Sequence, residues 1–215
     1  MTLCTVALGK LARAGVRVRG GGSALPGLLV ERLDPLFLRK TLDQLRYGVV
    51  LVSGTNGKTT TTKIVAELLE GAGLRVLTNR TGSNFVRGVI STILESIRYD
   101  GHLPFDVAVL ELDEAHAIHF VKQVAPRVSL LLNVMRDQLD RFGEIDYTAK
   151  LLATIAEHTT EAVVLNRDDP LIRRIAPTLD PGVDVHYFGV GPVLQHLFPV
   201  DDQFRRRSAP VSTRP

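Results

Sequence analysis

The chain has 215 residues, of which 45% are hydrophobic and 23% charged, and its formal net charge is +3. This length suffices for one good-sized domain with its own core and is too short for a multidomain enzyme. No apolar run approaches the roughly 18 residues that a membrane helix needs, so we predict no transmembrane segment. Basic residues gather at 13–19 and 205–207 without interleaved aromatics, which favours a solvated surface over nucleic-acid binding.

The cysteine content limits the chemistry further. Cys4 is the only cysteine, which excludes a disulfide or a thiolate metal site within the chain and favours a reducing compartment. Residues 1–8 include a short apolar stretch but no preceding basic region and no convincing cleavage site. We therefore do not predict a signal peptide.

The first part of the chain has helical periodicity. Residues 3–46 contain two such patches, separated by Gly20-Gly21-Gly22-Ser23, and Pro35 interrupts the second patch, Leu25 to Leu45. Glycine and proline are the strongest local breakers of regular structure. We predict a helical lead-in over residues 1–47 with a flexible joint.

From residue 48 onward, β-rich runs alternate with helical ones. The predicted order is strand 48–53, helix 58–71, strand 74–78, helix 84–98, strand 105–111, helix 115–123, strand 128–133, helix 147–157, strand 161–165, helix 169–176 and strand 184–188. Apolar runs such as Val128 to Leu132 indicate strands buried on both faces. We predict an α/β fold, a mostly parallel sheet flanked by helices, over residues 48–190, and a disordered, irregular tail over 191–215.

The most informative motif follows the apolar stretch Val49 to Val52. It reads Ser53-Gly54-Thr55-Asn56-Gly57-Lys58-Thr59-Thr60, the pattern of a strand that turns through a phosphate-binding loop into a helix. Glycines let successive N–H groups face phosphate oxygens, Lys58 would neutralise the β- and γ-phosphates, and the Thr59 hydroxyl suits Mg²⁺. Val52 stands where the common G-x-x-x-x-G-K-[ST] pattern has its first glycine, which narrows the family. A glycine-rich turn without a ligand explains this motif poorly.

An acidic cluster, Glu111-Leu112-Asp113-Glu114, ends the apolar strand Val107 to Leu110. Ligands of parallel sheets gather at the carboxyl ends of the strands, where these carboxylates could hold a hard cation. Acidic residues also cap helices, and Asp113 could cap the helix that begins near Ala115. We favour a metal-binding role for Glu111 and leave both interpretations of Asp113 open.

Two further polar clusters follow apolar strands. Asn133 to Gly143 is denser in polar groups than a surface loop requires. Asn166-Arg167-Asp168-Asp169-Pro170 follows the strand Ala162 to Leu165, and the Asn166 amide could read the edge of a base. A plain turn with a helix cap would use the same residues, so both interpretations stay open on chemistry alone.

Together these clusters resemble the Mur ligase family, the ATP-dependent amide-forming enzymes of peptidoglycan synthesis. That family's P-loop NTPase-like central domain carries the G-T-N-G-K-T-T found here at 54–60, and an N-x-D-D element similar to 166–169. Within the family, three phrases look like those of the MurT branch, the ligase-like subunit of lipid II isoglutaminyl synthase. They run over residues 77–84, 111–115 and 136–144, and the resemblance covers about residues 5 to 190.

The resemblance implies roles for individual residues. Lys58 would bind phosphate and, with Glu111, serve catalysis, while Thr59 and Glu111 would share Mg²⁺ and Asn166 would contact adenine. Gln138 stands where many other Mur ligases have a metal-binding histidine. Lys150 lies near the place of their carbamoylated lysine, although a surface helix lysine is the simpler interpretation. The expected nucleotide-binding residues are Gly54, Thr55, Asn56, Gly57, Lys58, Thr59, Thr60, Asn166 and Asp169.

The resemblance also implies a reaction in the bacterial cytoplasm. ATP would activate the D-glutamate α-carboxyl of lipid II as an acyl phosphate, and ammonia from a GatD-like glutaminase partner would attack it. The C-terminal ligase domain and four-cysteine zinc ribbon of MurT proteins are absent from this sequence. We therefore expect ATP and Mg²⁺ but no zinc, and an inactive isolated chain. The alternatives are a stand-alone or truncated Mg·ATP-binding module without ligase activity and, more remotely, a folylpolyglutamate synthase relative.

Overall fold

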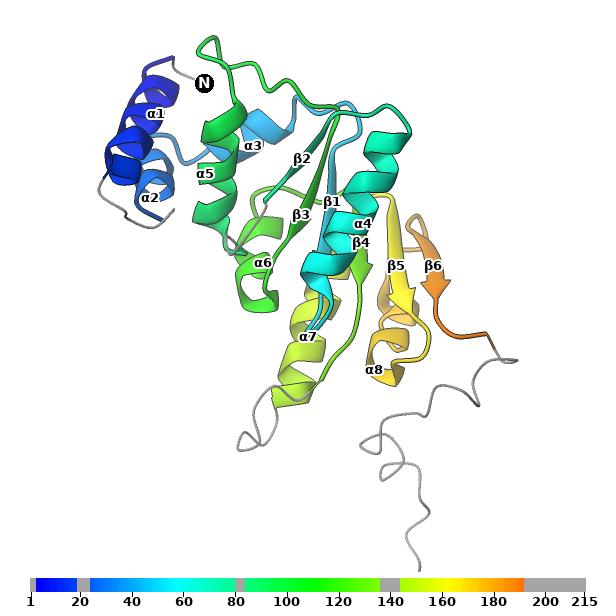
Figure 1. The fold of residues 1–215 in the computed structure, drawn as a ribbon. Helices are drawn as coiled ribbons and strands as arrows, with labels where there is room; N and C mark the ends of the chain where they lie inside the picture. Colours follow the sequence, from blue (N-terminus) through cyan, green and yellow to red (C-terminus); the bar gives the residue numbers. More distant parts are fainter. Residues whose placement is uncertain (1–2, 19–23, 80–83, 136–143, 192–215) are drawn as a thin grey trace, which may run out of the picture.

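A six-stranded parallel sheet forms the centre of the molecule (Figure 1). The computed structural model describes residues 3–18, 24–79, 84–135 and 144–191. Neighbouring strands pair in the order β2-β3-β1-β4-β5-β6, and all five pairings are parallel. The predicted α/β class is confirmed. The strands are β1 Val49–Ser53, β2 Val76–Thr78, β3 Val107–Glu111, β4 Val128–Leu131, β5 Ala162–Asn166 and β6 Asp184–Phe188.

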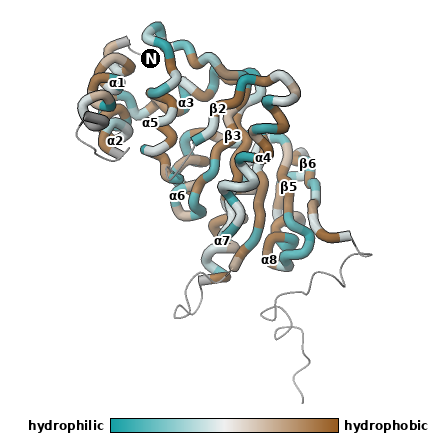
Figure 2. The backbone as a smooth tube through the Cα atoms, viewed as in Figure 1, coloured by the Kyte–Doolittle hydropathy of each residue, from teal (hydrophilic) through white to brown (hydrophobic). Residues whose placement is uncertain are grey.

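Helices cover both faces of this sheet. On one face, α4 packs Ala66 against β1 and β3 in a small cluster that includes Val52 and Val109. On the other face, α5 to α8 pack on a larger cluster. Hydrophobic residues run along the central strands (Figure 2), because a strand between two helical layers is shielded from water on both sides. The helices are α4 Lys58–Gly71, α5 Val86–Ser96, α6 Glu114–Val121, α7 Glu144–Glu157 and α8 Pro170–Arg173.

One predicted helix is interrupted. The expected helix over 169–176 is instead the single turn α8, followed by a short 3₁₀ helix, η1 Ala176–Thr178. The change begins at Ile175, whose N–H bonds the Ile172 carbonyl at 3.1 Å in place of the Leu171 carbonyl. Pro177 favours it, because a proline disfavours the α conformation of the preceding residue and its ring would clash with the Arg173 carbonyl in an α-helix. The prediction of one continuous helix here was wrong.

The amino-terminal helices share the main core. They are α1 Leu3–Val18, α2 Ala24–Leu33 and α3 Phe37–Leu42, and Pro35 lies in the turn between the last two. Val6 of α1 and Val30 of α2 are fully buried in the same cluster as Ile93 of α5. The helical lead-in is therefore packed onto the sheet layer through α5, as Figure 1 shows on the side away from β6.

Two predictions lie outside the described residues. The glycine-rich joint falls within 19–23, and the predicted tail falls almost entirely within 192–215. Of the helices that the structure describes, none combines the length and hydrophobicity needed to cross a membrane.

Candidate functional site

The loop between β1 and α4 leaves the amino end of a long helix open. Gly54 has φ +136° and Gly57 has φ +85°, both in the region that favours glycine. Gly57 is the residue before α4 and makes no side-chain capping bond, so the first N–H groups of the helix have no partner of that kind. Free N–H groups and the positive end of the helix dipole favour an anion at this position.

Gly54 is fixed by the packing of the loop on the end of β4. A Cβ atom added at Gly54 would lie 2.9 Å from the Asn133 nitrogen and 3.0 Å from the Leu132 Cβ. Real Cβ atoms essentially never approach a neighbour under 3.0 Å. A side chain at this position would push the loop away from β4.

Asn133 also holds the loop in place through hydrogen bonds. Its carbonyl accepts the Thr55 N–H at 2.9 Å. Its side chain accepts the Asn56 N–H on Oδ1 at 2.9 Å and donates Nδ2 to the Asn56 carbonyl at 3.0 Å. Because the N–H groups of Thr55 and Asn56 are used here, contact with a phosphate would fall to the groups that follow, from Gly57 to Thr60.

The Lys58 ammonium lies over the same loop. It donates hydrogen bonds to the carbonyls of Gly54 at 2.6 Å and Thr55 at 3.0 Å. Thr59 and Thr60 are exposed in the first turn of α4. The predicted phosphate-binding residues thus lie next to one another, and the Lys58 ammonium is held against their backbone.

Glu111 ends β3 next to the strand that enters the loop. It is in register with Val52 of β1, and the Ser53 hydroxyl donates to the Leu112 carbonyl at 2.9 Å. The Glu111 residue is only 5% exposed, and within the described part of the chain its Oε2 has no hydrogen-bond partner. A buried carboxylate oxygen is costly unless a donor or a cation compensates it.

A hard cation fits this carboxylate. Among the described residues no group of three or more His, Cys, Asp or Glu side chains could hold a metal ion by itself. Mg²⁺ is usually bound through one or two carboxylates together with substrate phosphates and water. Glu111 and the Thr59 hydroxyl are therefore the donors that this chain could offer to a magnesium ion carried by a nucleotide.

The other predicted polar residues mainly support local structure. Asp113 accepts the Ala115 N–H at 3.1 Å and caps α6, as one of its two interpretations expected. Asp169 is 4% exposed and caps α8, and its Oδ2 also accepts the Val134 N–H at 2.7 Å. A contact between Asp169 and a nucleotide stays a prediction.

Asn166 is the last residue of β5, and its side chain supports the turn that follows. Its Nδ2 donates to the Leu132 carbonyl at 2.8 Å, and its Oδ1 accepts the Asp168 N–H at 2.9 Å. A side-chain amide has two N–H groups and two lone pairs, so one of each remains after these bonds. Asn166 could still contact a base with what remains, and that role stays a prediction.

Some expectations cannot be placed. Gln138 and most of the phrase 136–144 lie outside the described residues, as do residues 80–83 of the phrase 77–84. Lys150 is exposed on α7. Two further residues were missed by the sequence analysis as parts of the site. Asn133 stood only within a polar cluster, and Asn79 only within a family-like phrase.

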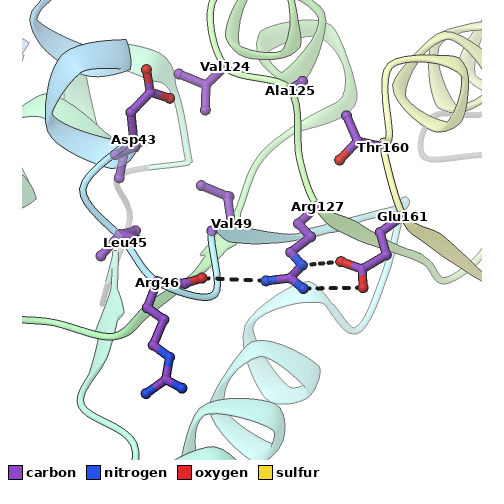
Figure 3. Close-up of a pocket in the computed structure, with 11 residues that line it drawn as sticks. Asp43, Leu45, Arg46, Val49, Val124, Ala125, Arg127, Thr160 and Glu161 are labelled. Atoms are coloured by element: carbon purple, nitrogen blue, oxygen red, sulfur yellow. Dashed lines mark hydrogen bonds and ion pairs between the residues drawn. The ribbon is translucent and has the colours of Figure 1, made fainter.

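A cavity of about 500 Å³ lies at the end of the sheet where β1 begins, opposite the end that carries the loop (Figure 3). Gly48 and Val49, at the start of β1, help to line it, whereas the phosphate-type loop follows the end of that strand. Arg127 forms an ion pair with Glu161 and donates to the Arg46 carbonyl at 3.4 Å. The pairing raises the pKa of Arg127 and lowers the pKa of Glu161. This cavity is separate from the loop site.

The fold and the loop identify the family. Residues 52–195 match the family model of the Mur ligase middle domain, and the chain belongs to the Mur ligase family. It is similar to the MurT subunit of lipid II isoglutaminyl synthase (glutamine-hydrolyzing) from Staphylococcus aureus strain COL, with 35% identity over 185 residues. It has 36% identity over 171 residues to the MurT subunit from Streptococcus pneumoniae strain ATCC BAA-255 / R6.

A solved structure agrees with this assignment. The MurF ligase of Thermotoga maritima, determined in complex with ADP, matches with a TM-score of 0.61 and 28% identity, covering 73% of this chain and 36% of that one. The two MurT alignments cover 85% and 79% of this chain but 40% and 36% of the relatives. This chain therefore spans about two fifths of the length of the MurT proteins that it matches.

Proposed function

We propose that this chain is the ATP-binding part of a MurT-like amide ligase. The observation that carries the proposal is the juxtaposition at one edge of the sheet. The uncapped start of α4 and the Lys58 ammonium follow β1, and Glu111 ends β3, the neighbouring strand. The buried Oε2 of Glu111 has no hydrogen-bond partner in the described residues. One half of this arrangement suits phosphate and the other half suits the cation that accompanies it.

Each group has a distinct task in the proposed site. The N–H groups from Gly57 to Thr60 bind the β- and γ-phosphates, and Lys58 neutralises their charge. Glu111 and Thr59 would hold Mg²⁺, which would offset the charge that develops during phosphoryl transfer. Asn166 contacts adenine through its remaining N–H and lone pair.

The proposed reaction amidates a carboxylate in cytoplasmic peptidoglycan synthesis. An oxygen of the D-glutamate α-carboxylate of lipid II attacks the γ-phosphorus of ATP, and ADP leaves, giving an acyl phosphate. Ammonia from a GatD-like glutaminase then attacks the acyl carbon, and inorganic phosphate leaves with formation of the amide. The similarity to MurT subunits supports this substrate. In such a transfer the protein must mainly position the reacting groups and neutralise their charge.

Two measurements test the proposal. Titration calorimetry of this chain with Mg·ATP should show saturable binding, and its absence would contradict the nucleotide assignment. The second measurement incubates the chain with lipid II, Mg·ATP, glutamine and a GatD-type glutaminase.

We expect this chain alone to bind Mg·ATP but not to amidate lipid II, because closing a site over ATP normally requires a second domain. Amidation should appear with a full-length MurT protein whose loop region is replaced by that of this chain. If that chimera binds ATP and still makes no amide, the chain is a nucleotide-binding module without ligase function.

A further inference from the structure

Asn79 lies at the point where β2 ends beside β3. The β2–β3 register closes with Thr78 opposite Val109, so Asn79 is the next residue beyond the paired part of β2. Its side chain, in a residue that is 1% exposed, forms two hydrogen bonds with the backbone of Glu111. Asn79 Nδ2 donates to the Glu111 carbonyl at 2.7 Å, and the Glu111 N–H donates to Asn79 Oδ1 at 2.9 Å.

These two bonds replace a strand partner. A side-chain amide has the same donor and acceptor groups as a peptide unit, so Asn79 extends the ladder beyond the last paired residue of β2. On its other side, β3 pairs with β1, where Glu111 is in register with Val52 and the Leu112 N–H bonds the Val52 carbonyl at 3.1 Å. The backbone of Glu111 is therefore held from both neighbouring strands.

The restraint on the Glu111 backbone also limits where its carboxylate can lie. Its Oε2 is buried and, among the described residues, without a hydrogen-bond partner. A strand end that could shift would let this oxygen reach water and avoid the cost of burial. Because Asn79 fixes both backbone polar groups of Glu111, the carboxylate stays at the edge next to the loop.

We propose that Asn79 is a positioning residue that holds Glu111 where it binds the cation of Mg·ATP. This inference rests on the proposed function. It predicts that Asn79 acts on the metal and not on the nucleotide itself. Residues that orient a metal ligand typically change metal affinity by about 10- to 100-fold when they are removed.

The test measures ATP affinity by calorimetry with Mg²⁺ and again with EDTA. The ratio of the two affinities gives the gain that Mg²⁺ provides. In Asn79→Ala we expect that gain to fall by about tenfold or more, while the affinity for metal-free ATP stays within about twofold. Glu111→Gln should lose the same gain without any change at Asn79.

A matched control separates positioning from stability. Ser129 is fully buried and its hydroxyl lies 2.6 Å from that of Thr159, so Ser129→Ala also removes a buried hydrogen bond. Its Mg²⁺ gain should equal that of the unmodified chain. If Asn79→Ala does not fold, Asn79→Asp replaces it, because the aspartate keeps the acceptor for the Glu111 N–H but loses the donor. Asn79→Asp should show the same loss.

The outcomes are distinguishable. A normal Mg²⁺ gain in Asn79→Ala, or in Asn79→Asp where that variant is needed, together with a lost gain in Glu111→Gln, overturns the inference alone. An equal loss in Ser129→Ala also overturns it, since any buried hydrogen bond would then suffice. Absence of Mg·ATP binding in the unmodified chain contradicts the proposed function instead.

Discussion

Asn133 binds both backbone polar groups of Asn56, donating Nδ2 to its carbonyl at 3.0 Å and accepting its N–H on Oδ1 at 2.9 Å. This pair joins the loop after β1 to the segment after β4. The loop is therefore shaped by protein contacts of its own. A preorganised loop binds a ligand with less loss of conformational freedom.

Removal of this brace should weaken nucleotide binding. In Asn133→Ala the loop loses two hydrogen bonds, and we expect Mg·ATP affinity to fall about tenfold and the free energy of unfolding to fall by about 1–3 kcal/mol. Asn133→Asp keeps the acceptor for the Asn56 N–H, so its Mg·ATP affinity and unfolding free energy should lie between those of Asn133→Ala and those of the unmodified chain. Calorimetry and urea unfolding measure these effects. An Asn133→Ala chain with unchanged affinity would show that the loop needs no brace.

Gly54 should not tolerate a side chain. In Gly54→Ala the new Cβ meets the backbone of Asn133, at a φ of +136° that alanine rarely adopts, so we expect a loss of about 1–3 kcal/mol in unfolding free energy. Gly71→Ala, at the end of α4, is the control because a Cβ there has nothing within 4 Å. It should leave stability unchanged or raise it by up to about 1 kcal/mol. Equal urea midpoints for the two variants would contradict the tight contact.

The packing of α2 on α5 gives a third prediction. A Cβ at Gly27 would clash with the Arg87 carbonyl oxygen and would lie 2.9 Å from its carbonyl carbon. Because these are backbone atoms, Gly27→Ala should force the helices apart and lower the unfolding free energy by about 1–3 kcal/mol. Gly15→Ala on α1 has open space around its Cβ and should be neutral or stabilising. If both variants melt alike, the lead-in helices do not pack as described.

Acid should remove one link between β2 and β3. Arg75 donates to Asp106 through its side chain at 2.8 and 3.0 Å and through its N–H at 2.8 Å, which lowers the pKa of Asp106 to about 2. A depressed carboxyl pKa stabilises the fold above the unfolded value and loses that effect as the pH falls through the folded value. The stability difference between the unmodified chain and Asp106→Asn should therefore shrink between about pH 4 and pH 2. Urea midpoints that differ equally at both pH values would contradict this link.

Local pattern was sufficient for much of the fold. Apolar runs such as Val107 to Leu110 predict buried strands because both faces of a parallel sheet are covered. The order of apolar and polar residues along the chain also predicts the loop from Gly54 to Thr60 and the position of Glu111 at the end of a strand. Local pattern did not predict the break after α8, where the Ile175 N–H bonds the Ile172 carbonyl shortly before Pro177.

The braces of the site depend on which strands are neighbours. Asn133 bonds a residue 77 positions away, and Asn79 bonds one 32 positions away. The first contact exists because β4 lies beside β1, and the second because β2 lies beside β3. No local periodicity encodes this strand order. Asn166 and Asp169 posed a different difficulty, since a turn, a helix cap and a base contact all use the same side chains.

The proposed function requires that the loop after β1 binds Mg·ATP through Lys58. Calorimetry of Lys58→Ala against Lys63→Ala tests this, because Lys63→Ala removes an exposed lysine five residues further along α4. We expect Lys58→Ala to keep the fold by circular dichroism and to show no measurable Mg·ATP binding. Lys63→Ala should bind like the unmodified chain. A folded Lys58→Ala chain with undiminished affinity would contradict the assignment of this loop.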